Sequence, residues 1–297
     1  MPTWDAEVVV DEPLVRRLLG AFPELAVGSV EPLSEGWDRS VWLVDGVWVF
    51  GFPRRAVVVP GVEREMEFLP RLAPLVPLPI PEPVFAGPPS ESFPWPFFGW
   101  RFIAGREAGN APREVRRARA LELAAFLRAL HARETFDAVG ASALPLDANE
   151  RADMAKRLPR ARAALDALRR ADVPAAARRI LADAESLPAP RHETVVHGDL
   201  HARQVLVDGP RVTGVIDWVD LGRADPAIDL QFLWSEVDPA DRADVLAAYG
   251  PLDDEQLLRA RVTALWLPAI VAASARDMGH REVERDSLLG LERAASD

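Results

Sequence analysis

The chain has 297 residues, of which 49% are hydrophobic and 27% charged, enough for a large core divided between two lobes. Its formal net charge of −11 excludes the basic face that nucleic-acid binding requires and is compatible with a cationic small-molecule partner. The chain has no cysteine, which excludes disulfides and thiolate chemistry and makes the cytoplasm the expected location.

Neither the N-terminus nor the apolar segments indicate insertion into a membrane. Residues 1–5 lack a basic region followed by an apolar core, so no signal peptide is expected. The longest uncharged apolar run, residues 262–275, is shorter than the ~18 residues of a membrane span. It predicts a buried helix, bent at Pro268. The sequence leaves the oligomeric state open.

The N-terminal third predicts a small antiparallel sheet with two helices. Residues 13–22 carry leucines at helical spacing. Residues 41–44 and 47–50 flank Asp45-Gly46, a dipeptide typical of two-residue hairpin turns. A second helix is expected over residues 62–72, where apolar residues and glutamates alternate on different faces.

A proline-rich connection follows this region. Nine prolines between residues 74 and 96 exclude regular helix and predict an extended segment with a short edge strand at residues 83–85. Residues 97–103 are typical of a buried strand, and the chain leaves that strand at Gly105. We therefore expect a small β-rich N-terminal lobe over residues 1–104 and a larger C-terminal lobe over residues 105–297.

The C-terminal part is predicted to be mostly helical around an embedded β segment, which makes the protein α+β. Apolar periodicity and helix-opening prolines support this. Helices are expected over residues 112–130, around 161–168, and over 174–187, 226–234, 242–249 and 254–275.

Two aspartates in the β segment are the strongest candidates for chemistry. Asp199 follows His197-Gly198 at the end of one apolar run, and Asp217 follows a second run beyond the turn at Asp208-Gly209. Such an arrangement can hold two carboxylates over one small volume, as phosphoryl transfer with a divalent metal requires. Each aspartate taken alone is equally compatible with a turn residue that caps its own backbone.

Other chemistries match the sequence less well. His197, Asp199 and His201 would share one face of an extended segment, but a zinc hydrolase needs further ligands, and the other histidines sit in no matching motif. A Walker-type phosphate loop is absent, and so is the G-x-S-x-G motif of serine hydrolases.

The motifs around these aspartates resemble the aminoglycoside phosphotransferase family, small-molecule kinases with a protein-kinase-like fold. The resemblance implies two lobes: a small antiparallel-sheet N-lobe that binds the nucleotide, residues 1–104, and a larger, mostly helical C-lobe for catalysis and substrate binding, residues 105–297. It extends to a nucleotide-covering loop at residues 35–38, a third strand at residues 50–55 and a hinge at residues 98–105. The segments that carry it are His197-Gly198-Asp199-Leu200-His201, Val205-Leu206-Val207-Asp208, Val215-Ile216-Asp217-Trp218 and Asp225-Pro226-Ala227-Ile228-Asp229-Leu230.

The resemblance also implies roles for individual residues. Asp199 would face the acceptor hydroxyl, with His197 fixing its loop, and Asp217 would bind Mg²⁺ that bridges the nucleotide phosphates. Asp229 would support the Asp199 loop, or else be an ordinary polar residue early in a helix. The residues implied to contact ATP or GTP are Gly36, Ser40, Glu65, Phe102 and Ile103.

Two positions depart from the family pattern. Gln204 stands where the family has a metal-binding asparagine; its amide oxygen is either a Mg²⁺ ligand or an ordinary polar group at a strand start. Gly51 stands where the family has a phosphate-pairing lysine or arginine in the third strand. Arg54 and Arg55 are the nearest substitutes, since arginine grips phosphate bidentately, or they are solvated loop charges. Lys156, the only lysine, lies in the other half of the chain.

The sequence thus predicts a phosphotransferase that moves the terminal phosphate of ATP or GTP to a hydroxyl of a small molecule, an antibiotic or a metabolite. The alternative is a nucleotide-binding homologue with weakened catalysis, suggested by Gly51 and Gln204. An acidic wall suited to a cationic acceptor is one interpretation of four acidic residues, and ordinary exposed helix charges are the other. Those residues are Glu236, Asp238, Asp241 and Asp244.

Overall fold

The structure is a computed structural model that describes residues 6–36, 38–147 and 149–297. The predictions for residues 1–5 and for Trp37 in the nucleotide loop lie outside the described residues. The chain forms two compact units, which are described separately. The first consists of Met1–Pro74, Pro79–Ala104 and the distant segment Asp217–Val219; the second consists of Leu75–Leu78, Gly105–Ile216 and Asp220–Asp297.

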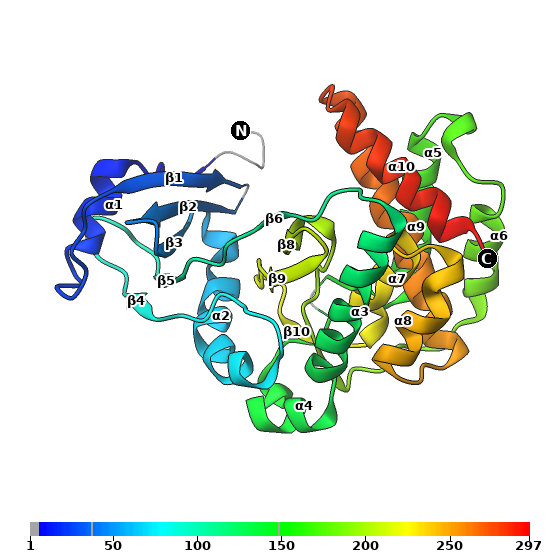
Figure 1. The fold of residues 1–297 in the computed structure, drawn as a ribbon, viewed down its shortest axis with the longest axis horizontal. Coiled ribbons are helices and arrows are strands. Elements are labelled where there is room, and N and C mark those ends of the chain that lie inside the picture. Colours follow the sequence, from blue (N-terminus) through cyan, green and yellow to red (C-terminus); the bar gives the residue numbers. More distant parts are fainter. Residues whose placement is uncertain (1–5, 37, 148) are drawn as a thin grey trace. The chain divides into compact units, whose positions relative to one another are not determined.

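The first unit is built on a five-stranded antiparallel sheet in the order β1-β2-β3-β5-β4 (Figure 1). The predicted hairpin is confirmed, but its loop has three residues instead of two, because Val44 pairs with Trp48 and β3 begins one residue later than expected. Asp45 and Gly46 both have positive φ, a conformation common in tight hairpin turns. The strands are β1 (Val30–Glu35), β2 (Arg39–Val44), β3 (Trp48–Pro53), β4 (Phe85–Gly87) and β5 (Phe97–Arg101).

One helix covers each face of this sheet, because alternate side chains of a strand point to opposite faces. Trp42 and Phe52 lie in the core formed with α1 (Glu12–Leu19). Val49 lies in the core on the other face, which includes Val62 of α2 (Val59–Leu72). Both helices are therefore fixed by apolar packing.

The proline-rich connection contains no α-helix between residues 74 and 96, as predicted, although a short 3-10 helix at Ala73–Leu75 overlaps its start. Its edge strand lies two residues later than expected, at β4 rather than at residues 83–85, because pairing with β5 decides the register. Helix α2 begins three residues earlier than expected, with Pro60 in its first turn, where a missing N–H costs nothing.

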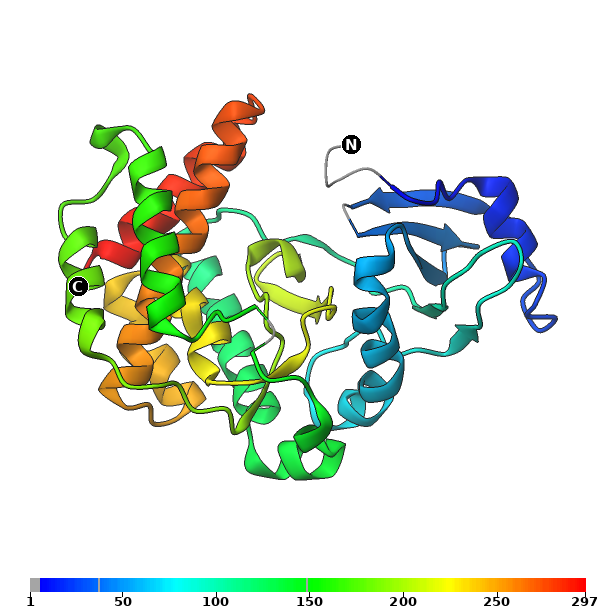
Figure 2. The ribbon, with the colours of Figure 1, turned by 180° about the vertical axis from the view of Figure 1, so that it is seen from behind.

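The second unit is mainly helical and contains two small sheets (Figures 1 and 2). One sheet has the order β6-β8-β9 and the other pairs β7 with β10. The strands are β6 (Arg106–Glu107), β7 (Thr194–Val196), β8 (Val205–Asp208), β9 (Arg211–Val215) and β10 (Gly222–Ala224); the helices are α3 (Arg113–Leu130), α4 (Arg133–Val139), α5 (Met154–Ala167), α6 (Ala177–Asp183), α7 (Phe232–Ser235), α8 (Arg242–Tyr249), α9 (Asp254–Asp277) and α10 (Arg281–Ala295).

Several helix predictions for this unit need correction. Residues 226–234 are not one α-helix: a 3-10 helix at Pro226–Gln231 precedes the short α7. Helix α6 is shorter than the predicted 174–187. Helices α4 and α10 were not predicted, because each presents only a thin apolar stripe in a charged sequence.

Helix α9 lies at the centre of the helical packing and contacts α5 and α10. By length and composition alone it would be able to cross a membrane, but half of its most apolar stretch is buried within the protein. Leu265 and Ala269 of α9 belong to an apolar cluster together with Leu165 and Leu291. The helix continues past Pro268 to Asp277.

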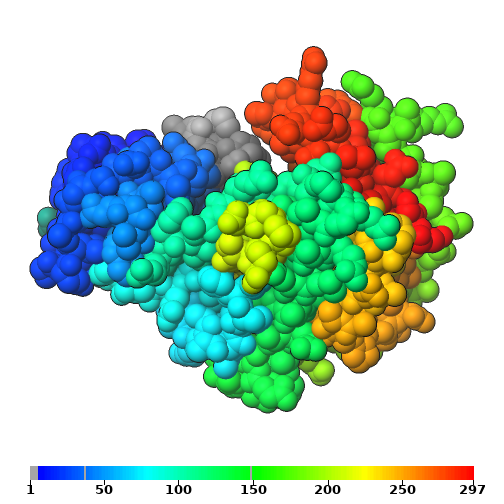
Figure 3. All heavy atoms as spheres, in the orientation of Figure 1, coloured from blue at the N-terminus to red at the C-terminus, as the bar shows by residue number. Residues whose placement is uncertain are grey.

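The β8–β9 hairpin is held against α3. Arg119 donates from Nε and Nη2 to the carbonyl of Gly209, at 3.0 and 2.8 Å. Glu122 accepts from the backbone N–H of Val212 at 2.7 Å. In the space-filling view the yellow-green tip of this hairpin lies at the surface beside green residues of the α3 region (Figure 3). The hairpin that follows the Asp199 loop is thus anchored to a helix.

Burial of the aromatic core should decide the stability of the first unit. Phe52 is fully buried, so Phe52→Ala is expected to cost about 3–5 kcal/mol of unfolding free energy through lost burial and a cavity. The measurement is a urea titration followed by intrinsic fluorescence. Val57→Ala is the control, because Val57 is 72% exposed. Equal midpoints for the two variants would show that this core is not what stabilises the unit.

Candidate active site

The Asp199 loop begins where β7 ends, and it depends on a glycine. His197 is fully buried, and Gly198 has φ 90°, a conformation that strongly favours glycine. A Cβ atom at Gly198 would lie 2.3 Å from the carbonyl oxygen of Asp220. The tight backbone leaves the side chain of Asp199 28% exposed, so its carboxylate can reach a ligand.

A buried carboxylate holds the backbone of this loop by hydrogen bonds. Asp229, fully buried, accepts hydrogen bonds from the backbone N–H of His197 (2.7 Å) and of Gly198 (3.0 Å). His131 lies 3.2 Å from the same carboxylate and contacts the Tyr249 hydroxyl through its other ring nitrogen. Burial by itself would raise the pKa of Asp229, but the hydrogen bond from His131 and the neighbouring donors hold it below its usual value. Asp229 is therefore placed to fix the loop.

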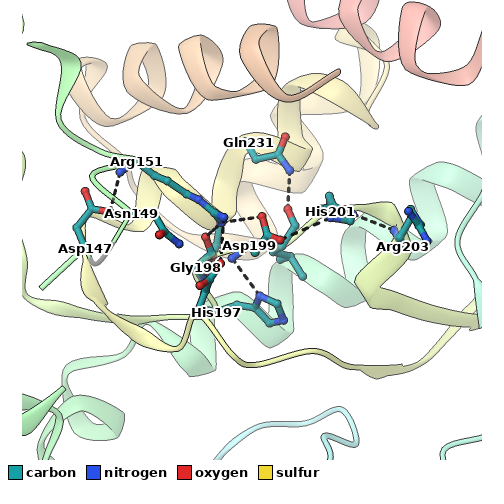
Figure 4. Close-up of polar contacts among 12 residues, drawn as sticks. Asp147, Asn149, Arg151, His197, Gly198, Asp199, His201, Arg203 and Gln231 are labelled. Atoms are coloured by element: carbon teal, nitrogen blue, oxygen red, sulfur yellow. Dashed lines mark hydrogen bonds and ion pairs between the residues drawn. The ribbon is translucent and has the colours of Figure 1, made fainter. Parts of the chain in front are cut away.

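Arg151 is paired with Asp199, and the sequence did not reveal it. Its Nη1 lies 2.6 Å from Asp199 Oδ1 and also donates to the carbonyl of Gly198, while Nη2 lies 3.0 Å from Asp220 Oδ2. Figure 4 shows the guanidinium pointing at the Asp199 carboxylate. Because the two residues are 48 positions apart in different elements, no local pattern predicts the pair.

The segment that carries Arg151 is itself anchored. Asp147 accepts from the backbone N–H groups of Arg151 and Ala152, at 2.7 and 2.8 Å. The buried Arg259 donates to the carbonyl of Ala152 at 2.6 Å, and Arg157 donates to the carbonyl of Arg151 at 3.2 Å. Arg151 is thus held in place by backbone contacts on both sides.

His201 is not a charged partner for Asp199. Its Nε2 lies 3.8 Å from Asp199 Oδ2, and burial, with the nearby His197 and arginines, lowers the pKa of His201 to about 3. It is therefore neutral near pH 7. In the described part of the chain no group of three His, Cys, Asp or Glu residues is arranged to hold a metal ion, so the His-x-Asp-x-His zinc site finds no support.

Gln204 ends the turn that links the Asp199 loop to β8. The residue is buried, and its carbonyl accepts from the backbone N–H of Ile216 at 2.9 Å. Ile216 in turn accepts from His197 Nε2 at 2.9 Å. The backbone before Asp217 is therefore held by the same loop that carries Asp199, within the second unit.

Asp217 itself belongs to the first unit. It has φ 65°, a left-handed conformation that is uncommon for a residue other than glycine, and its side chain is exposed. The next residue, Trp218, is fully buried and donates its backbone N–H to Glu65 Oε1 at 3.1 Å. Arg64 donates to the carbonyl of Val219 at 2.5 Å. Helix α2 thus fixes the backbone on which Asp217 stands.

The cation that pairs with Glu65 is Arg39, which the sequence did not single out. Glu65 is 1% exposed, and both of its oxygens accept from the Arg39 guanidinium, Oε1 at 3.2 Å from Nη1 and Oε2 from Nη2. Burial lowers the pKa of Arg39, while the charges of Asp217 and Asp38 act in the opposite direction. The pair lies inside the first unit, next to the Asp217 segment.

Arg54 and Arg55 do not pair with Glu65 but contact residues at the β1–β2 connection. Arg54 pairs with Glu35 and donates to the carbonyl of Gly36, both at 2.7 Å, while Arg55 pairs with Asp38. These contacts tie the two arginines to the end of β1 and to Asp38, which precedes β2. The structure thus places the two arginines on the candidate nucleotide loop rather than on Glu65.

The remaining candidate nucleotide residues lie in the same unit. Ser40 is buried and accepts from the indole N–H of Trp42 at 2.8 Å. Phe102 donates its backbone N–H to the carbonyl of Val47 at 2.7 Å and packs on the apolar cluster under α2. Ile103, next to it, is half-buried. Phe102 and Ile103 follow β5, at the end of the segment Pro79–Ala104 of the first unit.

The acidic stretch at residues 236–244 is neutralised by arginines, mostly from α3. Asp241 pairs with Arg113 at 2.7 Å, Asp238 with Arg116, and Asp244 with Arg117 at 2.6 Å. Glu236 lies 3.9 Å from Arg293. These carboxylates serve helix packing, so the interpretation as an acidic wall for a cationic acceptor is not supported.

Arg151 also lines a cavity of about 350 Å³. Three arginines and one carboxylate, Glu150, supply its charges. Within the described residues, the Nη atoms of the buried Arg157, stacked 3.8 Å from the Trp266 ring centre, have no hydrogen-bond partner. The lining residues are Asn149, Glu150, Arg151, Arg157, Arg160 and Trp266.

These features define a class: an antiparallel-sheet unit with a buried Arg–Glu pair and a helical unit with a supported aspartate loop, as in kinase-like phosphotransferases. Residues 29–261 match the model of the Phosphotransferase enzyme family, and the chain belongs to that family. The family match spans both units and includes Glu65, Asp199 and Asp217.

Comparisons with individual proteins agree with this family assignment. The chain is 22% identical to an aminoglycoside 2'-phosphotransferase solved as its GDP complex, with a TM-score of 0.68, covering 96% of this chain and 99% of that one. A macrolide 2'-phosphotransferase from Brachybacterium faecium is 22% identical, with a TM-score of 0.61 and coverage of 95% and 98%. At this identity the likeness shows the fold. Viomycin phosphotransferase from Streptomyces vinaceus is 43% identical over 84 residues, 26% of this chain and 28% of that protein.

The lowered pKa of His201 predicts how stability depends on pH. Below the ordinary pKa of 6.5 the unfolded state binds a proton that the folded state, with a pKa of about 3, does not. Stability should therefore fall as pH drops below 6.5. Since the side chain is 24% exposed, solvent moderates the effect to about 1 kcal/mol by pH ~5.

His201→Gln removes the group that titrates, so its unfolding free energy should lack the fall expected for the wild type below pH 6.5. The difference in unfolding free energy between wild type and variant should therefore shift by about 1 kcal/mol in favour of the variant between pH ~7.5 and ~5. Chemical denaturation at both pH values measures the difference, and His280→Gln, an exposed histidine, serves as the control. A difference independent of pH would show that His201 titrates normally.

Proposed function

We propose that this protein transfers the terminal phosphoryl group of ATP or GTP to a hydroxyl group of a small molecule. The observation that carries the proposal is the support of Asp199: a loop fixed by the buried Asp229, with the Asp199 carboxylate partly exposed and paired to Arg151 at 2.6 Å. Phosphoryl transfer depends on positioning and electrostatics more than on covalent work by the protein. The reaction therefore needs a rigidly held group that can accept the hydroxyl proton.

In the proposed reaction Asp199 accepts a hydrogen bond from the acceptor hydroxyl. The hydroxyl oxygen forms a bond to the terminal phosphorus while the bond from that phosphorus to the bridging oxygen breaks, releasing ADP or GDP. The hydroxyl proton passes to Asp199. Arg151 holds the carboxylate in position by its contacts with Asp199, Gly198 and Asp220.

We assign Asp217 of the first unit and Gln204 of the second as the candidate ligands of a magnesium ion. Asp217 offers an exposed carboxylate and Gln204 an amide oxygen, and Mg²⁺ prefers one or two such ligands together with nucleotide phosphates and water. When bound, the ion neutralises charge on the phosphates. The left-handed backbone of Asp217 and the burial of Trp218 hold the carboxylate ready for that use.

A weakly catalytic nucleotide-binding protein is the second candidate. Gln204 favours it, because the longer amide side chain changes where its oxygen falls, and octahedral Mg²⁺ tolerates little displacement. Nucleotide affinity with and without Mg²⁺, combined with single-turnover transfer to a panel of hydroxyl compounds, separates the two. Nucleotide binding without transfer to any acceptor would favour this candidate.

The acceptor panel should include anionic compounds as well as cations. The acidic stretch at residues 236–244 is already paired with arginines, and arginines dominate the cavity beside Arg151. Aminoglycosides, macrolides, hydroxy acids and sugar derivatives therefore all belong in the panel. The chain's family and the chemistry of its relatives support an antibiotic-like acceptor, and the arginine-rich cavity supports one with anionic or oxygen-rich groups.

Asp199→Asn should abolish transfer while leaving nucleotide affinity unchanged. The amide keeps the shape of the side chain but cannot accept the proton, and a loss of about 10²–10⁴-fold in the transfer rate is expected from the loss of a positioned base. Single-turnover transfer and calorimetric titration with nucleotide give the two values. Simultaneous loss of both would show that Asp199 is a structural residue.

A further inference from the structure

The two faces of the β2–β3 hairpin show which residues are able to reach Glu65. Residues directly opposite on antiparallel strands point to the same face, and Val41 is opposite Gly51 while Leu43 is opposite Val49. This is the face that packs on α2, since Val41, Leu43 and Val49 belong to the cluster that contains Val62. A side chain at position 51 would therefore project toward the helix that carries Glu65.

Arg39 lies on that same face, one diagonal step from Gly51. It is two residues before Val41 on β2, and diagonal neighbours about 7–8 Å apart remain within reach of long side chains. Its stem passes over the glycine: a Cβ atom at Gly51 would lie 3.6 Å from Arg39 Cδ. Its guanidinium lies 5.5 Å from the ring centre of Phe98, the residue paired with Gly51 on β5.

Gly51 makes this path available. A Cβ atom there would also lie 3.1 Å from the ring of Trp100, closer than an ordinary contact. A long side chain at position 51 and the side chain of Arg39 would thus compete for one space between β3 and Glu65. With glycine at position 51, that space is left to Arg39.

We infer that Arg39 is the phosphate-pairing cation of this protein, transposed from the third strand to the second, and that Gly51 is the space it requires. The inference rests on the proposed nucleotide-dependent function. Glu65 holds the guanidinium bidentately, as Arg–carboxylate geometry favours, and the guanidinium lies within the electrostatic influence of Asp217. The buried Arg39 Nε has no partner among the described residues.

The transposition removes the reason for regarding Gly51 as a lost catalytic residue. Arg54 and Arg55 pair with Glu35 and Asp38, while Arg39 pairs with the glutamate that would otherwise bind the third-strand cation. The first unit therefore retains a complete cation–carboxylate pair, with its two members on β2 and α2.

The test is a swap of the charge between the two strands in the full chain. Affinity for ATP and GTP with Mg²⁺ is measured by calorimetry for wild type, Arg39→Ala, Arg39→Gln and the double variant Arg39→Ala/Gly51→Lys. Arg39→Ala and Arg39→Gln should weaken binding about ten- to a hundredfold, as expected for the loss of a charged hydrogen-bonding group. The double variant should recover most of this loss, and Gly51→Lys alone, which crowds Arg39, should not improve binding.

Arg71→Ala is the matched control, because Arg71 is an exposed arginine on the same helix as Glu65, and its affinity should equal that of the wild type. Thermal unfolding identifies any variant that fails to fold; Arg39→Gln, which retains a donor to Glu65, then replaces Arg39→Ala. Wild-type affinity in folded Arg39→Gln would overturn the inference, as would a folded double variant no better than Arg39→Ala. A wild type that binds neither nucleotide would instead refute the proposed function.

Discussion

The organisation of the first unit depends on one buried carboxylate. Glu65 of α2 receives the guanidinium of Arg39 from β2 and the backbone N–H of Trp218 from a segment more than 150 positions away. An unpaired carboxylate in such a place would cost several kcal/mol, so its partners are held firmly. Strand, helix and the backbone that carries Asp217 are thereby joined in one hydrogen-bonded group.

The second unit repeats this principle with a different residue. Asp229 is buried beneath the Asp199 loop and receives two backbone N–H groups and His131. Gly198 permits the close approach to Asp220 on the other side of the loop. In both units a buried acid fixes backbone next to a more accessible acid, the partly exposed Asp199 in one unit and the exposed Asp217 in the other. An arginine accompanies each buried acid: Arg39 pairs with Glu65, and Arg151 pairs with Asp199 on the loop that Asp229 fixes.

Short-range patterns were sufficient for most elements. The Asp45-Gly46 hairpin, the helices with broad apolar faces and the proline-rich connection follow from turn chemistry, periodicity and the restriction that proline places on φ. Elements with weak local signals were missed or misjudged. Helix α10 buries only Gly290, Leu291, Ala294 and Ala295. Residues 226–231 form a 3-10 helix although Asp225 and Pro226 give the same start signal as an α-helix.

The sequence by itself determined the family resemblance and the candidates Asp199, Asp217, Gln204 and Glu65, because those residues lie in local motifs. It pointed to Arg54 and Arg55 as substitutes for the cation absent at Gly51, since they are its nearest basic neighbours along the chain. Tertiary structure alone placed Arg39 on Glu65 and Arg151 on Asp199. Both are contacts between elements distant in sequence, and side-chain reach across a sheet or between loops depends on strand register and packing, which no local pattern records.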